Sequence, residues 1–352
     1  MARGEIERKN SISVKFGKCP VFFIQNSPPI YLTFPCFSPI FRHGAFFIVS
    51  SCWGSPVLKL QVRLFLFFLI VLPVTQSAAA TPSQDIWRVD LRAVARLSAE
   101  EQWFSKLSFY RWQEDRWQIS NAETFFQTHQ PEIPLIVFAP GYTSTTSQTT
   151  KVGLGLVRTF NPQKACRVVF WDWYSERGNE RLRRDVRSKL PVIDHAAGYL
   201  ALFLQKLEPQ SKVCLFGFSF GSRVVCNATE ALRKNGQAGL RLHLVLAGAA
   251  TDRDWFAQGQ RHGRVPEIAE KILVTYNPDD WVLRFYPFLY EFSCRAKALG
   301  YAGLPMRNIP PEFRDKFENI NVERYIGDEH QTLFHVRTAP FQSRIDTYFF
   351  FE

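Results

Sequence analysis

From about residue 135 onward, short apolar runs of strand length alternate with longer stretches that carry apolar residues at helical spacing. Runs that are apolar along their whole length are typical of strands buried on both faces, as in a parallel sheet. The sequence therefore predicts a mostly parallel sheet with helices on both faces, an α/β fold. The expected strands are 135–139, 167–171, 213–216, 240–247, 272–276 and 320–326, and the expected helices are 122–129, 149–160, 185–207, 222–235, 282–299 and 342–350.

Residues 85–120 show a different pattern, in which tryptophans and other apolar residues alternate with polar ones. Alternation with a period of two is typical of strands with one solvated face. A polar turn at 113–116 interrupts the pattern. We expect two or three antiparallel strands at one edge of the sheet.

The first 80 residues differ from the rest of the chain. Residues 1–56 have neither a helical nor a strand period, and we expect them to be unstructured and to precede the true start of translation. Residues 57–80 give a basic patch, an apolar run from Leu64 to Leu72 and then small residues, which is the order of a secretory signal peptide. Residues 81–352 then form one domain, exported to the periplasm or the extracellular space.

The apolar run at 64–72 leaves a second possibility open, an uncleaved leader that anchors the protein. A helix that spans a bilayer needs about 20 apolar residues, so this run favours a cleaved signal peptide. Contact with a membrane is expected only if the leader stays attached.

Charge and cysteine content narrow the possible functions. The net charge is +11, but residues 1–80 hold eight basic and two acidic residues, which leaves 35 basic and 30 acidic residues for 81–352. So small an excess does not predict a nucleic-acid-binding protein. Four of the seven cysteines lie in 81–352, without metal-ligand spacing. We expect Cys214 and Cys226 to be small buried hydrophobic residues, and disulfide pairing stays open for an exported protein.

One stretch, residues 212–226, combines the elements of a reactive site. An apolar strand is followed by Gly217, Ser219 and Gly221 in the pattern G-x-S-x-G, and then by a helix. A serine on a sharp strand-to-helix turn presses the residues two positions away against each other, so that only glycine fits there. Ser219 is thus predicted to be a nucleophile, against the plainer interpretation of an ordinary turn.

A serine hydroxyl needs a base and an acid that orients the base. Asp280 follows the strand 272–276 through a proline turn and is the favoured acid, with Asp279 expected to cap the next helix. Asp252 and Asp254, after the preceding strand, are a second option. His330, in the loop after the last strand, is the favoured base.

His335 lies deeper in the next segment, and we expect it to be a packed or capping residue rather than the base. The oxyanion of the reaction needs backbone N–H donors. Phe220, directly after the serine, supplies one, and Tyr142, in the loop after the strand 135–139, is expected to supply the other because Gly141 lets that loop bend toward Ser219.

A run of charge at 177–187 follows the segment Trp171-Asp172-Trp173. A solvated loop and helix face is the favoured interpretation of such a run. The alternative is a contact with an anionic substrate or surface near the mouth of the pocket.

Four segments resemble the α/β-hydrolase superfamily, and more closely a bacterial branch of uncharacterised hydrolases: Ala-Pro-Gly-Tyr at 139–142, Val-Phe-Trp-Asp-Trp at 169–173, Gly-Phe-Ser-Phe-Gly-Ser-Arg at 217–223, and Leu-Ala-Gly-Ala-Ala-Thr-Asp at 246–252. The resemblance covers about residue 85 to the end. It implies a central sheet, a serine nucleophile and no cofactor. Pro140 stands where the first loop often has histidine, which weakens the match of that loop.

These observations predict a serine hydrolase that acts on an ester or related acyl bond through Ser219, His330 and Asp280. Its partner would be a small or lipid-like acyl substrate, with no nucleic acid and no metal. The alternative is a non-catalytic binding protein on the same scaffold, because a fold does not fix a function.

Overall fold

The computed structural model describes residues 13–16, 19–22, 84–160, 164–236, 239–290 and 297–351. The chain divides into two units, 1–77 and 78–352. In the first unit, β1 (Ser13–Phe16) and β2 (Cys19–Phe22) pair antiparallel, two short strands where the sequence predicted no regular structure. The rest of 1–56 and the predicted signal peptide at 57–80 lie outside the described residues.

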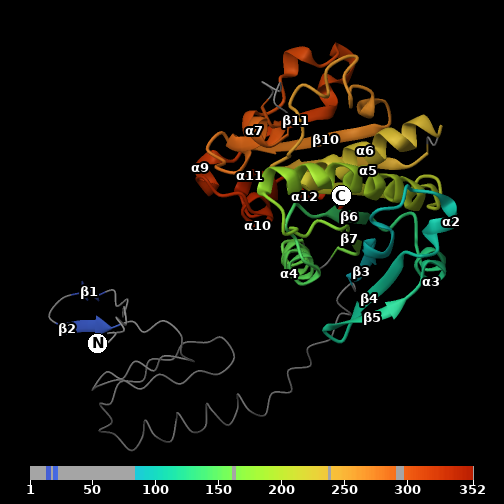
Figure 1. The fold of residues 1–352 in the computed structure, drawn as a ribbon, viewed down its shortest axis with the longest axis horizontal. Coiled ribbons are helices and arrows are strands. Elements are labelled where there is room, and N and C mark those ends of the chain that lie inside the picture. Colours follow the sequence, from blue (N-terminus) through green and yellow to red (C-terminus); the bar gives the residue numbers. More distant parts are fainter. Residues whose placement is uncertain are drawn as a thin grey trace, which may run out of the picture. The chain divides into compact units, whose positions relative to one another are not determined.

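The second unit is built around a nine-stranded sheet with the strand order β11-β10-β9-β8-β6-β7-β3-β4-β5 (Figure 1). The seven strands from β11 to β3 in this order run parallel to one another. At the other end, β4 pairs antiparallel with both β3 and β5. The strands are β3 (Asp85–Asp90), β4 (Ser108–Gln113), β5 (Arg116–Ser120), β6 (Leu135–Ala139), β7 (Arg167–Asp172), β8 (Lys212–Phe218), β9 (Arg241–Ala247), β10 (Ala269–Tyr276) and β11 (Phe317–Asn321).

Two hydrophobic clusters show that both faces of the sheet are covered. Val137 and Leu215 belong to the cluster that includes residues of α5 and α6, while Phe138 and Phe216 belong to the cluster on the side of α4. Successive strand residues point to opposite faces, so the parallel strands are buried on both faces. The helices are α2 (Glu101–Phe104), α3 (Ala122–Gln127), α4 (Thr146–Val157), α5 (Leu182–Gln205), α6 (Phe220–Lys234), α7 (Tyr286–Tyr290), α8 (Leu299–Ala302), α9 (Glu323–Ile326), α10 (Thr332–Val336), α11 (Ala339–Gln342) and α12 (Ile345–Tyr348).

This arrangement confirms the predicted mostly parallel sheet with helices on both faces. The tryptophan-rich segment gives the three strands expected, at one end of the sheet with β5 outermost. Of the three, β3 is antiparallel to β4 but parallel to β7. Glu114 and Asp115 make the hairpin turn, and both have positive φ angles, as tight hairpin turns require.

The helix predicted at 282–299 was wrong. The described part of that stretch holds a 3-10 turn at Leu283–Phe285, the five-residue helix α7 and then an extended segment. Ala298 bridges Asp252 antiparallel, and the Leu299 N–H donates to the Thr251 carbonyl. The aromatic residues supplied a helical spacing, but the chain at Lys297 and Ala298 pairs with another loop, and a new short helix, α8, begins only at Leu299.

Two C-terminal elements also differ from the prediction. The strand expected at 320–326 is β11, which ends at Asn321, because the Asn321 side chain accepts a hydrogen bond from the Glu323 N–H at 2.9 Å and turns the chain into α9. The single helix expected at 342–350 is instead α11 and α12, separated by a turn at Ser343 and Arg344.

Cys166, Cys214 and Cys226 are buried free thiols, which confirms the prediction for the last two. Burial raises the pKa of the Cys166 thiol to about 12, so this residue is an inert packing group. None of the helices in the described part of the chain combines the length and the apolar character needed to cross a bilayer.

Candidate functional site

Ser219 sits on a strained turn between β8 and α6. Its φ and ψ angles are 52° and −118°, a conformation that costs a non-glycine residue free energy and is found mainly where function requires it. A Cβ atom added to Gly217 would lie 2.4 Å from the backbone of Ser222, and one added to Gly221 would lie 1.9 Å from the Ala139 carbonyl oxygen. Glycine is therefore required at both positions. Ser222 closes the turn by donating its hydroxyl to the Gly217 carbonyl at 2.8 Å.

Asp280 is fully buried just beyond the end of β10. Its Oδ1 accepts hydrogen bonds from the N–H groups of Val282 at 3.0 Å and Leu283 at 2.8 Å. Two backbone donors fix the orientation of the carboxylate and leave Oδ2 directed at a third group. The cap predicted for Asp279 belongs instead to Asp280, and Asp279 is exposed.

His330 joins the serine to the acid. Its Nδ1 lies 2.6 Å from Asp280 Oδ2, and its Nε2 lies 3.0 Å from Ser219 Oγ. The structure thus brings Ser219, His330 and Asp280 into one hydrogen-bonded chain, from three loops that are distant in the sequence. With the carboxylate as acceptor at Nδ1, that nitrogen carries the proton and Nε2 is free to accept one from the serine.

The other candidates lie elsewhere. His335 is fully buried, with Nδ1 2.9 Å from Thr275 Oγ1, and burial, with the nearby His330 charge, lowers its pKa to about 3. Asp252 accepts from the Asp254 N–H, and Asp254 accepts from Asn308. The carboxylate at His330 Nδ1 is that of Asp280, so the geometry favours Asp280 over the second option for the acid.

The loop at 140–145 lies directly against the serine. A Cβ atom added to Gly141 would be 3.0 Å from Ser219 Cβ, so a larger residue would press on the serine and glycine favours this close approach. The ring of Tyr142 meets the ring of Phe220 edge to face, with centroids 6.0 Å apart. The two residues predicted as oxyanion donors are therefore neighbours, one in this loop and one at the first position of α6.

Three residues that the sequence analysis did not single out hold this loop in place. Trp173 Nε1 donates to the Pro140 carbonyl at 2.9 Å. The Ser175 carbonyl accepts from the Thr143 N–H at 2.9 Å, and the Ser175 hydroxyl donates to the Ser144 carbonyl at 2.9 Å. These bonds fix the loop to the segment after β7. The one sequence signal was the position of Trp173 and Ser175 just beyond a strand end.

Asp185 is the third of these residues. It is buried near the start of α5, accepts a hydrogen bond from the Tyr142 hydroxyl and another from the Gly178 N–H at 3.0 Å, and lies 4.0 Å from Lys189 Nζ. Burial, helped by this carboxylate, raises the Tyr142 pKa well above its usual range. The charge run at 177–187 is therefore not wholly solvated, although Arg181 and Arg184 within it are exposed.

A cavity of about 210 Å³ opens beside the serine. It is lined by residues 140–144 of the loop, by Phe218 next to the serine, by Gln148 and Val152 of α4, and by residues 331–333 next to His330. The Phe218 ring also lies 4.9 Å from the His330 ring. The cavity therefore adjoins the hydrogen-bonded chain of Ser219, His330 and Asp280.

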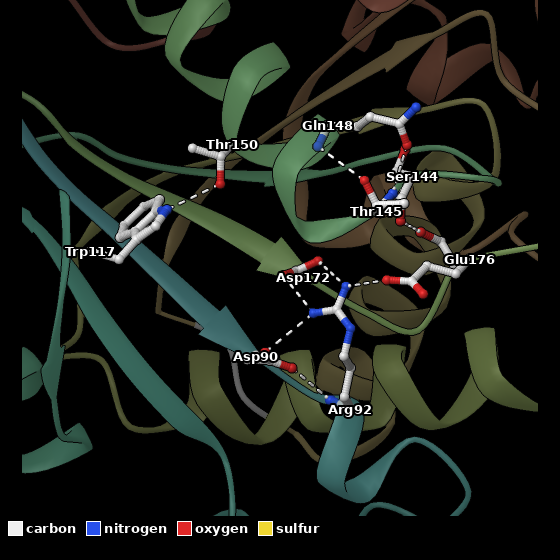
Figure 2. Close-up of polar contacts among 10 residues, drawn as sticks. Asp90, Arg92, Trp117, Ser144, Thr145, Gln148, Thr150, Asp172 and Glu176 are labelled. Carbon is white, nitrogen blue, oxygen red and sulfur yellow. Dashed lines mark hydrogen bonds and ion pairs between the residues drawn. The ribbon is translucent and has the colours of Figure 1, made fainter. Parts of the chain in front are cut away.

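A second polar cluster occupies the same edge of the sheet, at the ends of β3 and β7. Figure 2 shows Arg92 directed at three carboxylates. Its guanidinium lies 2.7 Å from Asp172, 3.1 Å from Glu176 and 3.2 Å from Asp90. We call these four residues the Arg92 cluster. Burial raises the Asp172 pKa, and the hydrogen bond and charge of Arg92 oppose that shift.

The strand order now decides the fold. The elbow follows β8 in the middle of a mainly parallel sheet, and the acid and the histidine follow in the order serine, acid, histidine after β10 and β11. The chain has the α/β-hydrolase fold. The predicted α/β-hydrolase fold is thereby confirmed, whereas the closer resemblance to one bacterial branch stays a prediction.

No family model and no curated protein matches this α/β-hydrolase chain. Solved structures that are similar to it include a bacterial heroin esterase, at 8% identity with a TM-score of 0.41, covering 84% of this chain and 90% of that one. An esterase of Pyrobaculum calidifontis matches at 12% identity with a TM-score of 0.34, covering 68% and 78%. Lipase B of Aspergillus fumigatus matches at 10% identity with a TM-score of 0.35. The match covers 61% of this chain and 52% of the lipase, so this chain spans about half the length of the lipase.

Proposed function

We propose that this protein is a serine hydrolase that cleaves an ester or a related acyl bond. The observation that carries the proposal is the pair of distances at His330, 3.0 Å to Ser219 Oγ and 2.6 Å to Asp280 Oδ2. A base within hydrogen-bond reach of a hydroxyl, itself oriented by a buried acid, is the arrangement that activates a serine. The strained turn at Ser219 supports the same role.

In the proposed mechanism, Ser219 Oγ attacks the carbonyl carbon while His330 Nε2 takes the hydroxyl proton. The Asp280 carboxylate stabilises the resulting imidazolium and stays ionised. The tetrahedral oxyanion accepts hydrogen bonds from the N–H groups of Phe220 and Tyr142. His330 then gives the proton to the leaving alcohol, an acyl-enzyme remains, and water releases the acid by the same steps.

The cavity beside Ser219 supports a small acyl group as the substrate. Its volume of about 210 Å³ lies below the range of roughly 300–1,000 Å³ that drug-sized ligands occupy. Its walls combine apolar side chains, Phe218, Val152 and Leu333, with polar loop residues. We therefore propose short acyl chains, and no nucleic acid, as the substrate class.

The alternative, a binding protein without activity, needs His330 to lie away from Ser219. The 3.0 Å distance favours the enzyme. A fluorophosphonate probe distinguishes the two. We expect it to label the wild-type protein, and not Ser219→Ala, because only an activated serine reacts. Ser222→Ala is the matched control, since Ser222 belongs to the same turn but bonds the Gly217 carbonyl. Equal labelling of wild type and Ser219→Ala would refute the nucleophile.

A series of p-nitrophenyl esters of increasing chain length tests the substrate class. We expect kcat/KM to be highest for acetate and butyrate esters and to fall for long chains, since the cavity has no room for them. Rising activity up to long chains would contradict the proposed class while leaving the nucleophile intact.

We also propose export by residues 57–80, on the order of basic, apolar and small residues there. N-terminal sequencing of the native protein is the test. A first residue near Thr81 supports cleavage, and recovery of peptides from residues 1–50 would contradict it.

A further inference from the structure

A larger cavity lies on another face of α4, where that helix covers the strands β3 and β5. Its volume is about 650 Å³, within the range of small-molecule sites. No aspartate or glutamate is among the residues that line it. Three cations, three hydroxyl residues and two apolar or aromatic residues line it: Arg88, Lys151, Arg158, Thr146, Ser147, Thr150, Leu154 and Trp117.

Arg88 is the unusual member of this lining. Its side chain belongs to a residue only 8% exposed, and its Nε has no hydrogen-bond partner. Within the described residues it forms no ion pair. Instead, its guanidinium lies over the rings of Tyr110, 4.1 Å from the centroid, and Trp117, 5.2 Å from the centroid. Cation–π contacts hold the charge in place without neutralising it.

Arg167, which is also buried and lies on the neighbouring strand, has the ion pair that Arg88 lacks among the described residues. Its guanidinium lies 2.6 Å from Asp85 and donates to the carbonyl oxygens of Phe125 and Thr128, both at 2.8 Å. A buried charge is costly unless it is paired. Arg167 finds its acceptors inside the protein, whereas Arg88 faces a cavity from which any acceptor has to come.

Helix α4 supplies the rest of the wall. Lys151 and Arg158 project from it into the cavity, and neither forms an ion pair with the described residues. Trp117 Nε1 donates to the Thr150 hydroxyl at 3.1 Å, which ties β5 to the helix (Figure 2). The helix begins at Thr146, after a capping box formed by Thr145 and Gln148. The helix ends at Val157 with Arg158 as its C-cap, so the cavity extends along the whole helix.

This cavity is distinct from the one beside Ser219. Gln148 and Val152 line the smaller cavity, while Thr150, Lys151 and Arg158 line the larger one. Gly153 lies between them and packs closely on Phe170 of β7, where an added Cβ atom would be 2.4 Å from the ring. Helix and sheet are in contact there, so one helix serves two separate cavities.

We propose that the larger cavity binds a phosphate group, either free phosphate or the end of a phosphorylated small molecule. Three cations exceed the charge that one carboxylate neutralises, whereas a phosphate monoester carries close to two negative charges and three acceptor oxygens. Arginine and lysine donors beside hydroxyl groups are the chemistry that binds such an anion. The buried Arg88 guanidinium provides the fixed contact, and Lys151 and Arg158 close over the ligand from α4.

Titration calorimetry of the whole protein tests the site, with inorganic phosphate and phenyl phosphate as the two probes at constant ionic strength. We expect saturable binding of at least one probe, and the tighter one identifies the source of the phosphate. Lys151→Ala and Arg158→Ala remove exposed side chains and are expected to fold, and each should weaken binding about tenfold through a lost charge-assisted hydrogen bond.

Arg116→Ala is the matched control, because it removes one positive charge from β5, outside the cavity, where Arg116 is paired with Glu114. We expect it to change binding less than twofold. Arg88→Lys, which keeps the charge but not the planar donor set, should weaken binding while the melting temperature without ligand stays close to that of wild type. The proposal is overturned if neither probe binds up to about 10 mM, if acetate binds as tightly, or if Arg116→Ala weakens binding as much as the two helix variants.

Discussion

Two polar clusters lie at the carboxyl edge of the same sheet, and they are built on opposite principles. In the Arg92 cluster, one guanidinium is shared among Asp90, Asp172 and Glu176, at distances of 2.7 to 3.2 Å. In the other, the buried Asp280 is bonded to two backbone N–H groups and the ring of His330, and among the residues that the structure describes no lysine or arginine pairs with it. In the first cluster a cation binds the buried carboxylate of Asp172 directly, and the second leaves a carboxylate whose natural partner is a proton on histidine.

The backbone shows the same difference. Asp90 and Asp172 are the last residues of regular strands, whereas Ser219 follows its strand in a strained conformation with φ at 52°. Strain and an unneutralised buried acid both cost stability, and they persist where function requires them. The comparison therefore supports a structural role for the Arg92 cluster and agrees with the catalytic role that we propose for the Ser219 side of the edge.

Replacing each of the two buried acids, Asp280 and Asp172, by asparagine gives the sharpest test of this comparison. Asp280→Asn should lower kcat for a short ester by about 10⁴-fold, because the amide favours the wrong tautomer of His330. Asp172→Asn is the matched control and should leave kcat within a fewfold of wild type. The measurement is the initial rate at saturating substrate. An equal loss of kcat in both variants would contradict the assignment.

Removing the shared cation should affect stability instead. Arg92→Met leaves Asp172 buried without its partner, and breaking such a pair costs about 3 to 5 kcal/mol of the free energy of unfolding. Urea titration followed by circular dichroism measures the change. The double variant with Asp172→Asn should recover part of it. A variant as stable as wild type would show that the Arg92 cluster is not structural.

Gly221→Ala tests the elbow itself. The added methyl group would lie 1.9 Å from the Ala139 carbonyl oxygen, so the turn has to shift and Ser219 moves with it. A displacement of about 1 Å lowers catalysis about 10²-fold. Labelling by the fluorophosphonate probe, compared at equal folded protein, reports the loss. Gly155→Ala is the control on α4, since its added atom meets only the movable Leu333 side chain. Full activity in Gly221→Ala would show that the elbow is more tolerant than its geometry implies.

The smallest expected effect concerns pH. Burial, with the nearby His330 charge, lowers the His335 pKa from 6.5 to about 3 in the folded protein. Between these values the unfolded chain binds a proton that the folded protein does not, so the free energy of unfolding falls as the pH falls through that window. The loss between about pH 7 and pH 5 is roughly 2 kcal/mol for one such histidine.

His335→Gln should flatten this pH dependence, as measured by urea titration at a series of pH values. Buried His262, whose pKa is lowered to about 3 by burial and nearby arginines, should keep part of the slope in that variant. An unchanged slope would mean that His335 is protonated in the folded protein.

The sequence was most informative where the signal was local. Ser219 and its two glycines, the strand before them and the helix after them follow from neighbouring residues, and the structure has all of them. His330 and Asp280 were chosen by chain order and by their place after strands, and those two rules led to the pair that the structure brings together. Whether the group is catalytic remains a prediction.

Long-range contacts explain what the sequence did not show. The tryptophan at 173 and the acid at 185 hold the 140–145 loop across more than 30 positions of sequence, and the place of Trp173 after a strand does not indicate which loop it bonds. The helix expected at 282–299 was wrong for a similar reason, because pairing with residues 251–253 overrides the local spacing. In the sequence, nothing distinguishes Arg88 from other arginines in strands. In the structure, it is buried and forms no ion pair with a carboxylate of the described residues.

The bonds that hold the 140–145 loop have a kinetic consequence. Trp173, Ser175 and Asp185 hold it at four of its positions, 140, 142, 143 and 144, so the arriving substrate has little entropy to remove from the backbone that receives it. Rapid mixing with a chromogenic ester should then show one exponential burst, with no lag before it, at every substrate concentration.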